Sequence, residues 1–273
     1  MSGEAIKKSV REHYAAIARS GSSCCGPAAG GCCGPGTAEE LSLAIGYSAQ
    51  ELTAVPDGAN LGLGCGNPLA FAELKEGDVV VDLGSGAGFD CFLAARRVGA
   101  SGRVIGVDMT PEMLERARAN ARKGGYSNVE FRLGEIEHLP VADNTADMVI
   151  SNCVINLSTD KPQVFREARR VLKPGGRLLV SDLVLLRPLP ESVRESVEAY
   201  VGCISGAMLQ DEYLKTIREA GFRQVEVLGE SPYPIGSVTP DASERAARAE
   251  GLPPEDVAAA ACVISIRVRA VKG

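Results

Sequence analysis

Long apolar runs are missing from this 273-residue sequence. No stretch approaches the roughly 18 uninterrupted apolar residues of a membrane span, and the start, Met1–Tyr14, lacks the apolar centre of a signal peptide. An excess of basic residues is missing too, because the net charge is -6 and the pI is about 5.2. Binding to a phosphate backbone needs a basic surface. We therefore expect a cytoplasmic protein that binds neither membranes nor nucleic acids.

Histidine is scarce, and no C-x-x-C pair occurs. The two histidines, His13 and His138, lie in segments typical of surface residues, so neither is an obvious general base. Cysteine, by contrast, occurs nine times. In a reducing compartment cysteines are thiols, which favours metal, metalloid or redox chemistry over a disulfide scaffold. A buried cysteine can also be a small apolar residue, and we interpret Cys91 and Cys262 in this way.

Continuous apolar segments alternate with helical patterns along most of the chain. This alternation is typical of a Rossmann-like, doubly wound and mostly parallel α/β sheet. One helix is predicted at Pro111–Lys123, with Thr110 as its N-cap. The predicted strands are seven, the last of them antiparallel, at 78–83, 103–108, 129–133, 147–151, 177–182, 222–230 and 261–271.

Two parts of the chain depart from this alternation. Residues 1–70 are predicted to contain a helix at Glu4–Arg19, a cysteine-rich loop with two adjacent cysteine pairs, and a glycine-rich irregular loop at Val55–Ala70. Residues 71–273 form the main domain, with a helical insertion at 183–221 after the fifth strand. The paired cysteines are Cys24, Cys25, Cys32 and Cys33.

The strongest local motif is VVVDLGSGAGFD, residues 79–90. A buried strand runs into the glycines of Gly84–Gly88, which allow a ligand to approach the backbone closely. Asp108 ends the next strand, where a carboxylate can bind ribose hydroxyls. Phe89 replaces the third glycine of a dinucleotide fingerprint, and the acidic Asp82 suits a cationic amino-acid tail. This combination favours S-adenosylmethionine as the cofactor.

Three further cysteines occupy unusual local settings. Cys65 lies between glycines in LGLGCGNP, Cys153 follows the fourth predicted strand, and Cys203 stands in YVGCISGAM. Their separations match no zinc-finger spacing. Three thiolates without a fourth ligand would suit a soft trivalent centre.

The chain resembles the class I methyltransferases over 78–271, and more specifically the arsenite S-adenosylmethionine methyltransferases. The second resemblance rests on DLGSGAGFDC, GVDMTPEML, SNCVINL, LGCGNP and GCISGAM. It implies a methyltransferase domain at 71–273 whose insertion at 183–221 binds substrate, and a substrate pocket lined by Ser151–Ser158. It also implies cofactor contacts from Asp82, Gly84, Ser85, Gly86, Asp108, Met109, Ile136, Glu137 and Asn152.

The same resemblance implies a mechanism and partners. Cys65, Cys153 and Cys203 would hold As(III), from arsenite or its thiol conjugates, and the arsenic lone pair would attack the sulfonium methyl without a base. No permanently bound metal is implied. Cys32 or Cys33, or another of the paired cysteines, would close a disulfide with Cys65 that a thiol reductant such as thioredoxin or glutathione reopens.

Two other functions stay open from the sequence. The strand and glycine motifs would fit a methyltransferase of an organic small molecule equally well, and that enzyme would not need Cys153. The cysteines could instead form a non-enzymatic thiol module for zinc or copper, although no histidine ligands accompany them. The paired cysteines of the loop could also serve only to scavenge arsenite.

Overall fold

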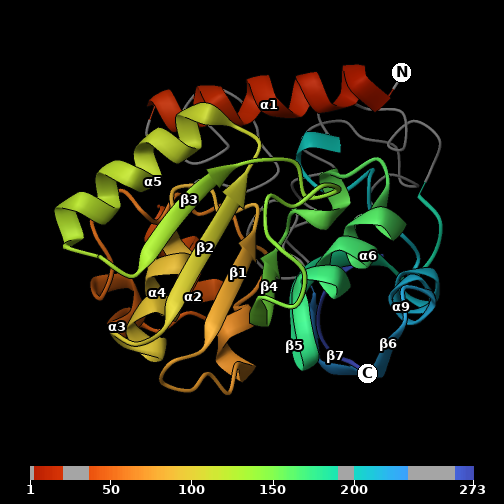
Figure 1. Cartoon of the computed structure of the whole chain (residues 1–273). Helices are drawn as coiled ribbons and strands as arrows, with labels where there is room; N and C mark the ends of the chain where they lie inside the picture. Colours follow the sequence, from red (N-terminus) through yellow and green to blue (C-terminus); the bar gives the residue numbers. More distant parts are fainter. Residues whose placement is uncertain (1–2, 21–36, 190–199, 233–261) are drawn as a thin grey trace.

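The computed structural model describes residues 3–20, 37–189, 200–232 and 262–273. One seven-stranded sheet has the order β3-β2-β1-β4-β5-β7-β6 (Figure 1). Strands β1 to β5 are parallel, whereas β7 is antiparallel to both β5 and β6. The mostly parallel sheet with an antiparallel last strand is therefore confirmed. The strands are β1 (Val79–Leu83), β2 (Arg103–Asp108), β3 (Val129–Leu133), β4 (Ala146–Asn152), β5 (Leu172–Leu185), β6 (Phe222–Pro232) and β7 (Val263–Lys272).

Helices cover both faces of the sheet. Successive side chains of a strand point to opposite faces, so Val80 of β1 packs with α4 and α5, while Val81 packs with α6 and α9. This double covering explains why the central strands are continuously apolar. Thr110 precedes α5 with Pro111 in its first turn, as predicted, although its side chain makes no capping hydrogen bond. The helices are α4 (Phe89–Val98), α5 (Pro111–Gly124), α6 (Lys161–Val171) and α9 (Gln210–Glu219).

Helix α1 (Gly3–Ser20) lies across the carboxyl ends of the parallel strands (Figure 1). Its buried side chains include Val10 and Ile17, which belong to the apolar clusters at this edge. Lys7 of the helix also donates a 2.6 Å hydrogen bond to Glu135, beyond the end of β3. The edge at which open α/β sheets bind ligands is therefore roofed by the N-terminal helix.

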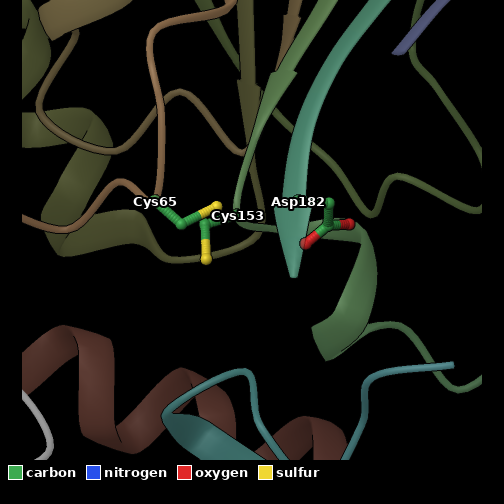
Figure 2. Close-up of side chains that lie close together, drawn as sticks. All are labelled: Cys65, Cys153 and Asp182. Atoms are coloured by element: carbon green, nitrogen blue, oxygen red, sulfur yellow. The ribbon is translucent and has the colours of Figure 1, made fainter. Parts of the chain in front are cut away.

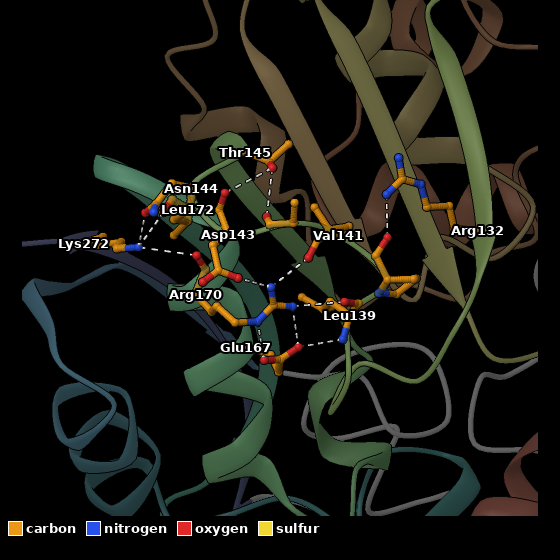
Figure 3. Close-up of polar contacts among 12 residues, drawn as sticks. Arg132, Leu139, Val141, Asp143, Asn144, Thr145, Glu167, Arg170, Leu172 and Lys272 are labelled. Atoms are coloured by element: carbon orange, nitrogen blue, oxygen red, sulfur yellow. Dashed lines mark hydrogen bonds and ion pairs between the residues drawn. The ribbon is translucent and has the colours of Figure 1, made fainter.

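The connection between β3 and β4 is tied to α6 by Arg170 (Figure 3). The guanidinium of Arg170 donates to the carbonyl oxygens of Leu139 and Val141, and it pairs with Glu167 at 2.7 Å. Glu167 in turn accepts a hydrogen bond from the Leu139 N–H at 2.8 Å. These contacts fix the loop that begins beyond β3 at the carboxyl edge.

The first 70 residues contain more helix than the sequence analysis expected. Helices α2 (Ala38–Ala44) and α3 (Ala49–Thr53) were not predicted, and the 3₁₀ turn η1 (Pro68–Phe71) begins within the predicted irregular loop Val55–Ala70. Both short helices begin with a capping box, in which the side chains of Thr37 and Ser48 accept from the backbone three residues later. The cysteine-rich loop lies outside the described residues.

The predicted insertion, 183–221, includes the end of β5 and the whole of α9, and its residues 190–199 lie outside the described residues. Strand β5 continues to Leu185 because its apolar end pairs with β7 through Leu185 and Val263. Helix α9 at the other limit packs into the core that covers the sheet, where Tyr213 and Ile217 are fully buried. Among the described residues, no helix is long and apolar enough to cross a membrane.

Candidate active site

The loop after β1 forms the floor of a pocket at the carboxyl edge. Gly84 has a φ of +66°, and a Cβ added to it would lie 2.4 Å from Val154 Cγ2. Glycine is therefore required there for both conformation and space. A Cβ added to Gly86 would meet no described protein atom within 4 Å, although Gly86 lines the pocket. The backbone at Gly86 thus borders space that a ligand can fill.

Asp108 ends β2 beside this loop. Its Oδ2 accepts a hydrogen bond from the Gly86 N–H at 2.9 Å, and its Oδ1 accepts from the Thr110 N–H at 2.8 Å. Burial raises the pKa of Asp108, and these backbone donors oppose the rise. Each carboxylate oxygen can accept a second hydrogen bond, as binding to a ribose diol requires.

Asp82 and Asp90 form a buried acidic pair in the same pocket. Tyr47 donates a 2.7 Å hydrogen bond to Asp90 Oδ1, and Asn152 donates one to Asp90 Oδ2 at 3.1 Å. Burial raises the pKa of Asp90 to about 6, against the lowering effect of these two donors. Burial and the charge of Asp90 raise the pKa of Asp82 well above its ordinary value. A cationic ligand would relieve this repulsion.

Asn152 connects the acidic pair to the loop that carries Cys65. Its Oδ1 accepts from the Cys65 N–H at 3.1 Å, and its Nδ2 donates to the Gly66 carbonyl at 2.8 Å. Gly64 allows this approach, because a Cβ there would lie 2.7 Å from Asn152 Nδ2. One side chain at the end of β4 therefore positions both parts of the site.

All nine residues predicted to contact the cofactor line one pocket. The pocket also contains residues that the sequence analysis did not single out, among them Tyr47, Asp90 and, from α1, Lys7 and Tyr14. Asp90 could have been suspected, because an acid in the first turn after a glycine loop is well placed to face a ligand. Tyr47 carries no such local signal. The nine predicted residues are Asp82, Gly84, Ser85, Gly86, Asp108, Met109, Ile136, Glu137 and Asn152.

Three cysteines from distant parts of the chain meet beside this pocket. The sulfur atoms of Cys65 and Cys153 and a carboxylate oxygen of Asp182 all lie within 4.8 Å of one another (Figure 2). The Cys203 thiol lies 3.0 Å from the carbonyl oxygen of Cys153. All four side chains are buried. Cys153 also lines the pocket described above, so it joins the two parts of the site.

Two of the three cysteines have a strained backbone. Cys153 has a φ of +56° and Cys203 a φ of +65°, a region that residues other than glycine rarely adopt. The Cys153 N–H donates to the Ser181 carbonyl at 2.8 Å, and the Cys203 N–H donates to the Tyr200 carbonyl at 2.9 Å. These two hydrogen bonds hold the backbone conformations. Strain of this kind is characteristic of functional positions, where the surrounding structure imposes it.

The cluster holds neutral thiols near one cation. Burial raises the pKa of Cys65, and contact with Cys153 together with burial raises the pKa of Cys203. The pKa of Cys153 is also raised well above its ordinary value, although its contact with Cys203 acts in the opposite direction. Lys161 is the nearby cation, and burial lowers its pKa while Asp182 opposes that change.

Asp182 was not predicted as a site residue. It ends the segment RLLVSD, an otherwise largely apolar predicted strand, so no local pattern marks it as a site residue. Only the three-dimensional structure places it beside Cys65 and Cys153. Burial raises the pKa of Asp182 to about 7, and the Tyr213 hydroxyl, which donates at 3.0 Å, opposes the rise. The prediction named three sulfur ligands, and the structure adds a carboxylate oxygen beside two of these sulfur atoms.

Of the described cysteines, Cys91 and Cys262 lie apart from the cluster. Cys32 and Cys33, together with Cys24 and Cys25, fall outside the described residues. Cys91 lies in the apolar core beneath the pocket, and its thiol donates a 3.1 Å hydrogen bond to Asp82. Cys262 is buried at the start of β7 and accepts a hydrogen bond from Arg187.

Comparisons with known proteins agree with this geometry. A family model described as a methyltransferase domain matches residues 74–221. A solved arsenic(III) S-adenosylmethionine methyltransferase from Chlamydomonas reinhardtii is 36% identical, with a TM-score of 0.63, and the match covers 86% of this chain and 73% of that one. The arsenite methyltransferases of Halobacterium salinarum and Homo sapiens are 52% and 41% identical over 230 and 168 residues, which are 82% and 58% of this chain.

Fold, pocket and family match together define a methyltransferase domain of the S-adenosylmethionine-dependent class. Within that class, the chain belongs to the arsenite methyltransferase family. It spans 59% of the length of the Halobacterium relative and 44% of the human one.

Proposed function

We propose that this chain transfers the methyl group of S-adenosylmethionine to thiolate-bound As(III), giving methylated arsenicals for detoxification. The observation that carries the proposal is the convergence of Cys65, Cys153 and Cys203 in one buried cluster beside the cofactor pocket. Ordinary packing does not require three thiols to meet, nor two of them to adopt a left-handed backbone. Soft thiolates are the preferred ligands of trivalent arsenic.

The charges and polar groups of the pocket support S-adenosylmethionine as its ligand. The buried pair Asp82 and Asp90 supplies negative charge for the cationic methionine part, and Asp108 lies where a ribose would need acceptors. The Ser85 hydroxyl is buried, lines the pocket and has no hydrogen-bond partner among the described residues. Such an atom is normally paired, so it favours a polar ligand group at this point.

The protein's task in this reaction is placement. When bound, the cofactor supplies an electrophilic methyl group. Arsenic held by three thiolates keeps a lone pair with which it can attack this methyl group. Because the three thiols are neutral, they can displace the three hydroxyl groups of arsenous acid as water, leaving no net charge buried. Cys153, which belongs to both parts of the site, directs the arsenic toward the pocket. Correct alignment of two bound reactants can be worth about 7 to 11 kcal/mol.

A direct assay tests the activity. Purified protein, arsenite, S-adenosylmethionine and a thiol reductant should give methylated arsenicals, measured by chromatography with elemental detection. Cys153→Ser should lose this activity, because a protonated hydroxyl is a poor ligand for a soft centre. Cys262→Ser is the matched control, since it changes a buried cysteine away from the cluster and should stay active. Full activity of Cys153→Ser would refute the arsenic proposal and favour an organic substrate.

The proposal includes a reduction step by protein thiols. Methyl transfer leaves arsenic formally pentavalent, and oxidation of two thiols to a disulfide returns the two electrons. Cys65 and one of Cys24, Cys25, Cys32 and Cys33 are the proposed pair, and a cytoplasmic thiol such as thioredoxin or glutathione would reopen the bond. Replacing all four by serine should allow about one transfer per site. Sustained turnover by that variant would leave these cysteines a scavenging role only.

A further inference from the structure

A carboxylate lies beside two thiols of the cysteine cluster. Asp182 lies at the end of β5 and is fully buried. One of its oxygens lies within 4.8 Å of the sulfur atoms of both Cys65 and Cys153 (Figure 2). Trivalent arsenic needs only three thiolates, so the proposed methylation gives this carboxylate no role. A buried acid facing two thiols therefore calls for another explanation.

The carboxylate is held as metal-binding carboxylates usually are. Tyr213 donates to Asp182 Oδ2 at 3.0 Å, and the Leu183 N–H donates to Oδ1 at 3.0 Å. The Asn156 backbone is a further donor to this carboxylate, which still has lone-pair capacity for another partner. Hydrogen bonds from an outer shell orient a ligand and are a regular feature of metal sites.

The charges favour a divalent ion on this donor set. Two thiolates and one carboxylate carry three negative charges, a divalent ion leaves one, and the half-buried Lys161 can balance it. The Lys161 ammonium is kept nearby by a 2.9 Å hydrogen bond to the Ser158 carbonyl. Sulfur and oxygen ligands of tetrahedral zinc lie about 3.5 Å apart, and the three ligand atoms here already lie within 4.8 Å of one another.

We propose that the cluster also binds a thiophilic divalent cation of the zinc class. Cys65, Cys153 and Asp182 would be its ligands, with Cys203 as the nearest fourth donor. Binding would release one proton from each thiol that becomes a ligand, and the bound ion would exclude arsenite from the same sulfur atoms. The proposal shares these thiols with the proposed function but does not depend on methyl transfer.

Cadmium is a suitable probe, because its thiolate complexes absorb in the ultraviolet. The parent for the titration is the full chain with Cys24, Cys25, Cys32 and Cys33 replaced by serine, so that these thiols do not compete. With Cd²⁺ alone, without arsenite or methyl donor, we expect one tightly bound ion per chain and a thiolate-to-cadmium absorption band. The experiment is repeated with Zn²⁺ by equilibrium dialysis.

Two variants of the parent and one control decide the ligands. Cys153→Ser should remove most of the absorption band, and Asp182→Asn should weaken binding about tenfold or more while its amide oxygen still accepts from Tyr213. Asp143→Asn, an exposed carboxylate, should bind as the parent does. If circular dichroism shows that Asp182→Asn does not fold, Tyr213→Phe replaces it and should also weaken binding. The proposal is overturned if a folded Asp182→Asn variant binds cadmium as tightly as the parent does. It is also overturned if the parent shows no thiolate-to-cadmium absorption band.

A chelator separates this proposal from the proposed function. Arsenite methylation by the unmodified chain in excess EDTA tests the enzyme alone, because EDTA removes divalent ions. Added Zn²⁺ without chelator should then raise the KM for arsenite and leave the KM for S-adenosylmethionine unchanged. Inhibition that arsenite cannot overcome would overturn the shared site, whatever the outcome of the methylation assay.

Discussion

Asp90→Asn tests whether the buried acidic pair faces the methyl donor. Asp90 is 7% exposed, accepts hydrogen bonds from Tyr47 and Asn152, and has a pKa of about 6. Above pH 6 the carboxylate is ionised and attracts a cationic ligand, whereas below pH 6 it is neutral. The affinity of the unmodified protein for S-adenosylmethionine should therefore increase as the pH rises through 6.

The size of the effect follows from the lost charge. A hydrogen bond to a charged group contributes about 1.5 to 3 kcal/mol, so Asp90→Asn should raise the Kd for S-adenosylmethionine roughly 10- to 150-fold at pH 7.5. The affinity of the variant should also lose its dependence on pH near 6. S-adenosylhomocysteine, which lacks the sulfonium charge, should show a smaller loss.

The same substitution should have the opposite effect on stability. A carboxyl whose pKa is raised from 3.8 to about 6 on folding gives stability that is present below pH 3.8 and is lost as the pH rises through 6. The loss is about 3 kcal/mol, at 1.36 kcal/mol per pH unit. The amide of the Asp90→Asn variant does not ionise. The unfolding free energy of the variant should therefore exceed that of the unmodified protein by more at pH 8 than at pH 5.

Calorimetry measures the binding, and urea denaturation measures the unfolding free energy, at pH 5, 6 and 8. Asp57→Asn is the matched control, because this carboxylate is almost fully exposed and lies away from the pocket. An unchanged Kd of Asp90→Asn at every pH would refute the placement of the methyl donor beside the acidic pair. A stability difference that does not change with pH would refute the raised pKa.

Three other substitutions test separate parts of the site. Asp108→Ala should raise the Kd for S-adenosylmethionine about tenfold or more in calorimetry and retain arsenite binding in a thiol titration; an unchanged Kd would mean that the ribose lies elsewhere. Gly84→Ala should lose about 1 to 3 kcal/mol of unfolding free energy in urea, because of its φ of +66° and the clash with Val154, and an unchanged midpoint would contradict this. Lys7→Met removes the ion pairs with Glu135 and Glu137 and should raise the cofactor Kd up to about fivefold at low salt, a difference that should shrink at high salt.

The amino-acid sequence determined the sheet and the residues that line the pocket at its carboxyl edge, because their signals are local. Strands covered on both faces are continuously apolar, and the glycine loop and Asp108 follow directly from the strands they end. The capping boxes that start α2 and α3 are equally local, and the sequence analysis missed them although T-A-E-E and S-A-Q-E were visible. The glycine-rich or strand-end settings of Cys65, Cys153 and Cys203 indicated a common soft-ligand centre, and the resemblance identified As(III) as its occupant.

Tertiary structure alone decided which other side chains join these residues. Asp182 enters the cluster because the parallel pairing of Asn152 with Ser181 brings the residues that follow, Cys153 and Asp182, side by side. Tyr47 reaches the acidic pair from a segment 43 residues before Asp90. Strand pairing and long-range packing depend on the whole core, and a single position in the sequence carries no mark of its partners. The chemistry of each residue was therefore readable in advance, but the composition of the site was not.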